Sequence, residues 1–300
     1  MAIAMSKPAR PGGQGLLAGR PVARVGFGVM QLAERPGRAP LPAGDAIALL
    51  RSAVELGINH FDTAQFYGAG LANDLIRRAL APYADDIVLV TKVGADHVDA
   101  PVPLKPAQQP HELRASVEAN LASLGVERLA VVNLRRLDIS PGLLATGDQV
   151  VNLDDQLAEL AALRAEGKIG AIGLSNVRLD QLQHAAGAGI ACVQNAYSLL
   201  DRSGEPLLDL CQQEGIAWVP FFPLGSAFPG RPKVTDQPTV IDAARALGVT
   251  PSQVGLAWLL QHAPNILLIP GTSSIGHLRE NVAAATTEIP PELVADLEAR

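Results

Sequence analysis

The sequence predicts an α/β fold, a single-domain (β/α)8 barrel, because short apolar runs alternate with longer helical patterns along the whole chain. Most of these runs are nearly all apolar rather than alternating, which is typical of parallel strands covered on both faces. Eight such alternations favour a closed barrel over an open doubly wound sheet, and no linker long enough to divide the chain is present. The eight expected strands are residues 24–30, 58–64, 87–93, 129–135, 171–176, 191–197, 216–222 and 266–272.

Helical periodicity fills the intervals between these runs. Thr250, followed by Pro251 and Gln253, forms a capping-box pattern with proline at the first helical position, which predicts a helix start. Glycine can supply the left-handed backbone that ends a helix, and it ends each of three periodic stretches. These stretches are residues 45–57, 111–125 and 153–167.

The N-terminal region predicts two features. Residues 1–15 have no sustained apolar segment and are expected to form a flexible tail, which leaves residues 16–300 for the barrel. The segment LLAGRPVARV suggests a β-hairpin that caps one end of the barrel. Residues 95–110 and 138–150 are polar or proline-rich, and we expect long loops that act as lids.

Composition excludes several classes of protein. The 300 residues carry a formal net charge of -6, which argues against a basic nucleic-acid-binding face, and no apolar run approaches the roughly 18 residues of a membrane span. The histidines are scattered and no C-x-x-C occurs, so no metal site is expected. Cys192 and Cys211 lie in apolar segments as expected for buried thiols in a reducing compartment. We expect a cytoplasmic protein that acts on a small molecule; the sequence leaves its oligomeric state open.

Candidate catalytic residues follow from the rule that barrel active sites lie at the C-terminal ends of the strands. Asp62 ends the second expected strand, Tyr67 follows in its loop, and Lys92 ends the third strand. Lys92, held charged by Asp62, would stabilise the phenolate of Tyr67, as a tyrosine that donates a proton requires. A structural ion pair beside an unrelated tyrosine is the alternative interpretation.

Two turns are candidate nucleotide sites. Residues 68–73 follow a strand, but Asn73 occupies the place of the third glycine of a dinucleotide fingerprint, so we interpret them as a turn without that role. In the segment IPGTSSIGHLREN a strand leads through glycine and three hydroxyl residues into a helix, which predicts a phosphate cradle. An ordinary helix cap is the alternative. The cradle consists of Thr272, Ser273 and Ser274.

At these residues the chain resembles the aldo-keto reductase family. The motifs GINHFDTAQFYGAG, VTKVG, AIGLSN, VQNAYS, FFPLG and IPGTSSIGHLREN occur in family order over roughly residues 20–285. The whole pattern, including VVNLR, is most similar to the pyridoxal reductase branch. The resemblance implies NADPH-dependent reduction of an aldehyde or ketone to an alcohol, pyridoxal to pyridoxine in particular, with NADH the less favoured cofactor.

The resemblance implies a catalytic tetrad in which Asp62, Tyr67 and Lys92 are three members. The family's histidine position is Arg135 here. A guanidinium stays protonated and cannot act as a neutral imidazole. We expect Arg135 to polarise the carbonyl oxygen or to bind an ionised oxygen beside it, such as the 3-oxygen of pyridoxal.

The resemblance also implies contacts to the cofactor. Ser175, Asn176 and Gln194 would hold the nicotinamide carboxamide. The nicotinamide ring would stack on Phe221, where the family usually has a tyrosine. The pyrophosphate and adenosine end would meet Leu224, Gly225, Ser226, Thr272, Ser273, Ser274 and Asn281.

The sequence departs from the family at the 2′-phosphate. The usual lysine is Gly271 and a common arginine is His277, so Arg279 is the candidate substitute. On the substrate side, Phe66 and Phe222 are expected to shape the pocket.

Two other functions stay open. The missing histidine is compatible with a non-catalytic NADP(H)-binding sensor or partner subunit that keeps the fold. A barrel lyase would use Lys92 as a Schiff-base amine, although Asp62 favours a charged lysine that is not nucleophilic.

Overall fold

The computed structural model describes residues 8–33, 39–100, 102–140, 142–225 and 232–299. Seven parallel strands form one curved sheet in the order β11-β10-β9-β8-β5-β4-β3. They are β3 (Phe27–Gly28), β4 (His60–Asp62), β5 (Val88–Val93), β8 (Leu129–Arg135), β9 (Ile169–Ser175), β10 (Ile190–Gln194) and β11 (Ala217–Trp218).

The segment expected as the eighth strand closes this sheet through single bridges rather than a continuous ladder. Ile266 is bridged in parallel to Trp218, and Leu268 is bridged in parallel to Val25. The backbone N–H of Leu267 donates to the carbonyl of Trp218 at 2.8 Å. The two ends of the sheet are therefore joined, so the fold is a closed (β/α)8 barrel and not an open sheet.

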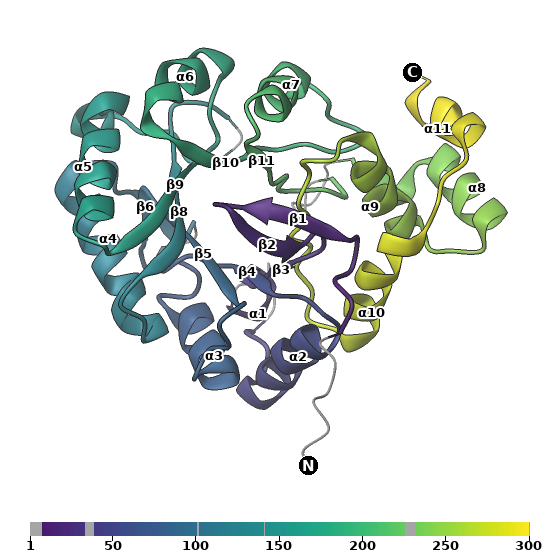
Figure 1. Ribbon diagram of the computed structural model, residues 1–300, viewed down its shortest axis with the longest axis horizontal. Helices are drawn as coiled ribbons and strands as arrows, with labels where there is room; N and C mark the ends of the chain where they lie inside the picture. The colour runs from purple at the N-terminus through teal and green to yellow at the C-terminus, as the bar shows by residue number, and fades with distance from the viewer. Residues whose placement is uncertain (1–7, 34–38, 101, 141, 226–231, 300) are drawn as a thin grey trace.

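Helices surround the strands on the outside of the barrel (Figure 1). The capping box expected at Thr250 is confirmed, because its hydroxyl and the Gln253 side chain bond each other's backbone N–H. None of the helices in the described part of the chain is long and apolar enough to cross a membrane. They are α1 (Met30–Ala33), α2 (Ala43–Glu55), α3 (Leu71–Leu80), α4 (Pro110–Leu124), α5 (Leu153–Ala165), α6 (Leu179–His184), α7 (Glu205–Gln213), α8 (Pro238–Leu247), α9 (Pro251–His262), α10 (Ile275–Ala283) and α11 (Pro291–Glu298).

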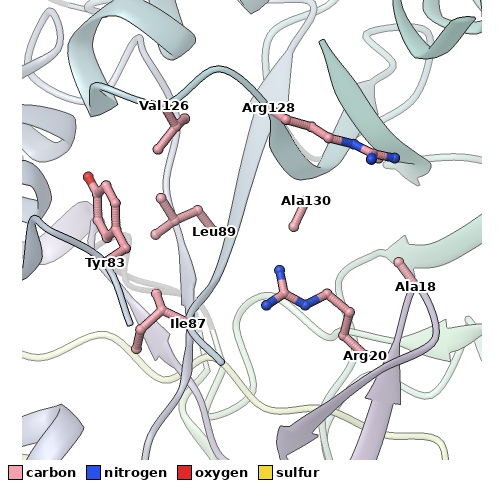
Figure 2. Close-up of a pocket in the computed structure, with 9 residues that line it drawn as sticks. Ala18, Arg20, Tyr83, Ile87, Leu89, Val126, Arg128 and Ala130 are labelled. Carbon is pink, nitrogen blue, oxygen red and sulfur yellow. The ribbon is translucent and has the colours of Figure 1, made fainter. Parts of the chain in front are cut away.

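An antiparallel hairpin lies across the end of the barrel where the strands begin (Figure 1). It consists of β1 (Gln14–Leu17) and β2 (Arg20–Ala23), joined by Ala18 and Gly19, which both have positive φ. Such backbone is typical of two-residue hairpin turns. Leu17 and Val22 pack into the barrel interior, while Ala18 borders a cavity at this end (Figure 2). The expected hairpin cap is confirmed. The boundary expected at residue 15 falls inside β1, and residues 1–7 lie outside the described residues.

A second hairpin occupies part of the first expected lid loop. It pairs β6 (Ala95–His97) with β7 (Leu104–Pro106), so the expectation of a long loop over the whole of 95–110 was wrong. Its proline-rich sequence lacks the alternation that marks a strand. Ala95 and Leu104 pack against Phe66 and Tyr67, which places this hairpin beside the second βα loop. The other expected loop, residues 138–150, contains a short 3-10 turn, Gly147–Gln149, and no other helix or strand among its described residues.

His60 fills the barrel interior two residues before Asp62 on β4. It is fully buried, and a Cβ atom at Gly26 on the neighbouring segment would lie 2.1 Å from its Nε2 atom. Burial lowers the pKa of His60 from 6.5 to about 4, although the backbone of Leu268 opposes this shift. The imidazole is therefore neutral in the folded protein at neutral pH.

This burial predicts a pH-dependent stability. The unfolded chain takes up the proton of His60 near pH 6.5 and the folded protein only near pH 4, so stability falls as the pH drops below 6.5. We expect His60 alone to lower the free energy of unfolding by about 2 kcal/mol at pH 5 relative to pH 7.5. Urea unfolding of wild type and His60→Gln at both pH values measures this difference.

The exposed His111 of α4 provides the matched control. His111→Gln removes a histidine whose side chain has no hydrogen bond or ion pair within the described residues, so the loss of stability at pH 5 should remain as in wild type. If His60→Gln lost as much stability as wild type between the two pH values, the neutral buried imidazole would not be the cause.

Candidate active site

A buried ion pair joins the ends of β4 and β5. The Lys92 ammonium contacts Asp62 Oδ1 and donates to the carbonyl of Thr63 at 3.3 Å. Burial opposes the charge on Lys92, but the Asp62 carboxylate and then Tyr67 outweigh it, so the pKa of Lys92 lies above its ordinary value. Lys92 is therefore an ammonium at neutral pH, which argues against its use as a nucleophilic amine.

Tyr67 lies beside this ion pair. The Lys92 Nζ atom is 5.2 Å from the centre of the Tyr67 ring, and Phe66 packs edge-on against the same ring with centres 5.1 Å apart. The chain after Tyr67 turns through three consecutive residues with positive φ before α3 begins at Leu71. The glycine pattern of this segment thus serves the turn that places the tyrosine. These residues are Gly68 (φ 59°), Ala69 (φ 52°) and Gly70 (φ 91°).

Asn73 fastens this turn to the rest of the barrel. Its side chain is fully buried, and its amide nitrogen lies 2.9 Å from acceptors on Gln65, Asn120 and Ser123. Its carbonyl oxygen accepts from the Thr63 hydroxyl at 2.7 Å. The sequence analysis interpreted Asn73 only as a residue in place of the third fingerprint glycine and did not predict this role. Asn73 lies on the buried, apolar side of α3, and this position could have indicated a buried polar contact.

Gln194 connects the far side of the barrel to the ion pair. Its amide nitrogen donates to Asp62 Oδ2 at 2.7 Å. Its carbonyl oxygen and the hydroxyl of Ser175 are both buried and have no hydrogen-bond partner among the described residues. Buried polar atoms without partners are costly, so this pair forms a ready site for a group such as a primary amide.

Asn176, which follows Ser175, has positive φ (59°) and a different environment. Its amide nitrogen donates to the carbonyls of Ile139 at 2.8 Å and Arg136 at 3.2 Å. These bonds hold the loop that follows β8. Only the carbonyl oxygen of Asn176 is left for another ligand.

Arg135 ends β8 on the same side of the barrel. Its guanidinium lies over the ring of Phe221, 5.7 Å from the ring centre, and pairs with no carboxylate in the described part of the chain. Burial lowers the pKa of Arg135 and the nearby Tyr67 opposes the shift. Because a guanidinium is such a weak acid that it hardly loses its proton, the group stays cationic. The site therefore holds a desolvated positive charge close to Tyr67.

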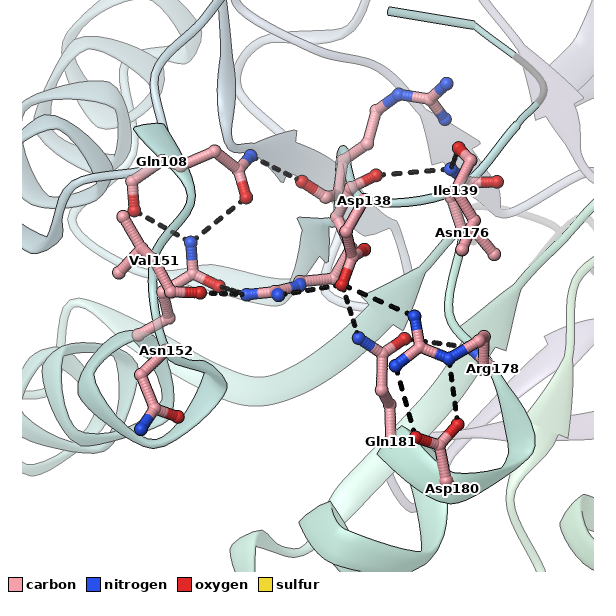
Figure 3. A network of polar contacts seen from close by, with 12 residues as sticks. Gln108, Asp138, Ile139, Val151, Asn152, Asn176, Arg178, Asp180 and Gln181 are labelled. Carbon is pink, nitrogen blue, oxygen red and sulfur yellow. Dashed lines mark hydrogen bonds and ion pairs between the residues drawn. The ribbon is translucent and has the colours of Figure 1, made fainter. Parts of the chain in front are cut away.

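A polar network supports the backbone of Arg135 (Figure 3). Gln108 donates to the carbonyl of Arg135 at 2.8 Å, and Gln156 donates to the carbonyl of Gln108 at 2.7 Å. The buried Arg136 bonds Gln156 and pairs with Asp138 at 2.9 Å. Burial opposes the charge on Asp138, but Arg136 and the bond from the Gln181 side chain outweigh it and lower its pKa. Sequence reasoning did not identify these residues; a second arginine directly after Arg135 was the one visible signal.

The N-terminus of α10 carries the hydroxyl residues expected to bind phosphate. Ser274 caps this helix and accepts from the backbone N–H of His277 at 3.5 Å. The Thr272 hydroxyl accepts from the backbone N–H of Ser274 at 3.1 Å. The ordinary helix cap is thus present, and the first-turn amides still point out of the helix end.

Comparison with known proteins identifies the family. A model of the Aldo/keto reductase family matches residues 24–300. This chain belongs to the aldo/keto reductase family. It is 44% identical over 285 residues to the pyridoxine 4-dehydrogenase of Escherichia coli, covering 94% of this chain and 96% of that protein. It is also 31% identical to the probable aldo-keto reductase 1 of Glycine max, covering 96% of this chain and 87% of that protein.

Solved structures of aldo-keto reductases show the same fold. The aldo/keto reductase from Klebsiella pneumoniae in complex with NADP and acetate is 26% identical, with a TM-score of 0.75 and coverage of 98% of this chain and 95% of that one. A thermostable aldo-keto reductase in complex with the inhibitor epalrestat is 25% identical, with a TM-score of 0.78 and coverage of 95% and 98%. The predictions of the family, the barrel and an oxidoreductase are confirmed.

In this aldo-keto reductase the backbone leaves no room at Gly271 for the lysine that the family usually has at this position. A Cβ atom at Gly271 would lie 2.7 Å from the carbonyl oxygen of Gly28. No side chain fits there without moving the backbone of β3. The nearby Arg279 is exposed on α10, while Asn281 on the same helix is buried.

The residues that the resemblance implied for the pyrophosphate and for the second wall of the substrate pocket lie in the segment that follows β11. Gly225 has φ 87°, and a Cβ atom there would lie 2.6 Å from the carbonyl oxygen of Pro232. Leu224 accepts from the backbone N–H of Val234 at 3.0 Å. Phe222 packs edge-on against Phe221. Ser226 lies outside the described residues.

The structure therefore brings six of the expected residues into a single cluster. The cluster consists of Asp62, Tyr67, Lys92, Arg135, Gln194 and Phe221, linked by the contacts given above. Phe66 is buried between Tyr67 and the second hairpin rather than open to a cavity.

Proposed function

We propose that this enzyme uses NADPH to reduce an aldehyde to an alcohol, with pyridoxal as the substrate and Tyr67 as the proton donor. The buried Lys92–Asp62 ion pair beside the Tyr67 ring is the observation that carries the proposal. The near full-length similarity to a pyridoxine 4-dehydrogenase supports the substrate, and the Klebsiella structure with NADP supports the cofactor.

The proton step follows from the charges around Tyr67. When the phenol gives its proton to the substrate oxygen, the Lys92 ammonium stabilises the phenolate that is left. Asp62 keeps Lys92 charged, and Gln194 fixes the second oxygen of Asp62. The reduced nicotinamide, when bound, supplies the hydride for the carbonyl carbon.

The residues at the nicotinamide end fit this cofactor. The carboxamide N–H groups would satisfy the buried Ser175 hydroxyl and the Gln194 carbonyl oxygen, which otherwise have no partner among the described residues. Asn176 would accept through its remaining oxygen. Phe221 offers an aromatic face for the ring. Arg135 covers one face of Phe221, so stacking on that face requires Arg135 to turn aside.

The adenosine end would use α10 and the loop after β11. Backbone N–H groups at the N-terminus of α10 and the hydroxyls of Thr272, Ser273 and Ser274 suit a phosphate. Arg279 supplies the positive charge that Gly271 cannot carry, which favours NADPH over NADH. Asn281 would meet the adenine, and Leu224, Gly225 and Ser226 the pyrophosphate.

Arg135 supports the choice of pyridoxal as the substrate. A desolvated guanidinium without a carboxylate partner in the described residues attracts an anionic oxygen. Pyridoxal has a phenolic oxygen next to its aldehyde, so its anion would pair with Arg135 while Tyr67 meets the carbonyl oxygen. Phe222 would form a wall of the pocket, and Phe66 would act from behind it by packing against Tyr67.

Replacing Tyr67 tests the mechanism. Tyr67→Phe keeps the ring but removes the proton donor, so kcat for pyridoxal should fall by at least about 100-fold. NADPH binding, followed by quenching of protein fluorescence, should change little. Tyr83→Phe is the control, since the Tyr83 hydroxyl bonds Leu124 at the other end of the barrel. Undiminished turnover of Tyr67→Phe would rule out Tyr67 as the proton donor. NADPH binding by wild type without any aldehyde reduction would favour the alternative function, a non-catalytic NADP(H)-binding sensor.

Replacing Arg135 tests the substrate. Arg135→Met should lower kcat/KM for pyridoxal by roughly tenfold more than for benzaldehyde, because only pyridoxal has the adjacent oxygen anion. Arg135→His, which restores the family residue, should narrow the difference between the two aldehydes. Equal losses on both substrates would contradict pairing with that oxygen.

Replacing Arg279 tests the cofactor preference. Arg279→Gln should raise KM for NADPH by roughly three- to tenfold and leave KM for NADH unchanged, since an exposed charge contributes modestly. Arg245→Gln is the control, because Arg245 is an exposed residue of α8 that pairs with Asp242. A parallel rise in KM for both cofactors would show that Arg279 does not contact the 2′-phosphate.

A further inference from the structure

The end of the barrel opposite the active site contains a cavity of about 480 Å³ (Figure 2). It lies between the turn of the N-terminal hairpin and the beginnings of β5, β8 and β9. Ala130 near the start of β8 borders this cavity, while Arg135 at the other end of the same strand belongs to the active site. The cavity is therefore separate from the catalytic cluster.

Two arginines line this cavity from different elements (Figure 2). Arg20 comes from β2, and its guanidinium is held by a hydrogen bond to the carbonyl of Asp85. Arg128 is the residue directly before β8. Within the described ranges, neither guanidinium forms an ion pair with a carboxylate. Two like charges facing one space repel each other, and an anion between them would relieve that repulsion.

The rest of the lining is mainly apolar, and the one other polar side chain, Tyr83, donates its hydroxyl hydrogen to the carbonyl of Leu124. Ile87 and Leu89 form its buried wall, with exposed fractions of 9% and 6%. Gly170 shapes another side, since a Cβ atom there would lie 2.6 Å from the carbonyl oxygen of Ala130. A bare inorganic ion would leave this apolar surface in contact with water. A ligand with an apolar body as well as an anionic group would cover it.

We propose that this cavity binds a small organic anion, an oxyanion attached to an aromatic or aliphatic body. Arg20 and Arg128 would bind the oxyanion, because guanidinium groups match both phosphate and carboxylate with paired hydrogen bonds. Ile87 and Leu89 would contact the body of the ligand. This site is independent of the proposed aldehyde reduction.

Calorimetric titration of the full-length protein with phenyl phosphate tests the proposal. The titration is made with and without saturating NADP+, so that an anion site filled by the cofactor is distinguished from the cavity. Arg20→Gln and Arg128→Gln should each weaken binding at least about tenfold, as expected for the loss of a charged hydrogen-bond donor. Arg245→Gln removes the same charge elsewhere and should leave the affinity unchanged. Unaltered binding by both cavity variants, binding abolished by NADP+, or no binding at all would overturn the proposal.

Two further probes define the ligand class. Benzoate in place of phenyl phosphate shows whether the site takes carboxylates or phosphate esters, and binding of either with the same dependence on Arg128 supports it. Inorganic phosphate lacks the apolar body and should bind at least about tenfold more weakly than phenyl phosphate, in keeping with the apolar area that it leaves uncovered. Equal affinity for the two phosphates would contradict the contact with Ile87 and Leu89.

Discussion

The rest of the site depends on one charge, the Lys92 ammonium, kept inside the barrel by Asp62. A buried ammonium is unfavourable unless it is paired and its N–H groups are bonded. The pairing of β4 with β5 sets Asp62 opposite Val90 and so brings Lys92 within reach, while Thr63 provides a second acceptor. Gln194 then binds the other carboxylate oxygen, which links strands from opposite parts of the barrel through one side chain.

Unusual backbone geometry is concentrated around this charge. Three of the four non-glycine residues with positive φ in the described part of the chain lie in loops that follow a strand at the same end of the barrel as this charge, and the fourth, Ala18, lies in the first hairpin. The three are Ala69, Asn176 and Phe222. Such conformations are costly for residues with a Cβ atom and persist where the surroundings enforce them. Here buried hydrogen bonds do so, from Asn73 for the loop of Tyr67 and from Asn176 itself for the loop after β8. Hydrogen bonds to the barrel thus hold these loops in their strained conformations.

The sequence allowed the architecture and the central charges to be predicted because both follow local rules. Strand runs, helix caps and the turn of the first hairpin are periodic or depend on a few adjacent residues. Asp62 and Lys92 were found because parallel strands end at one face of a barrel. The partner of Gln194, and the chain from Arg136 through Gln156 to Gln108, depend on contacts between distant segments that no local pattern records. The second hairpin escaped notice because its proline-rich strands lack alternation.

The contact between Gly28 and Gly271 has a consequence for redesign. A Cβ atom on Gly28 would lie 2.5 Å from the carbonyl oxygen of Ile269, and one on Gly271 would meet Gly28 in turn, so neither position has room to diversify. Inserting the family lysine at residue 271 would therefore distort the barrel seam before it reached a nucleotide. Attempts to retune this enzyme for a differently charged dinucleotide have to begin on the outer turns of α10, where side chains are free to change.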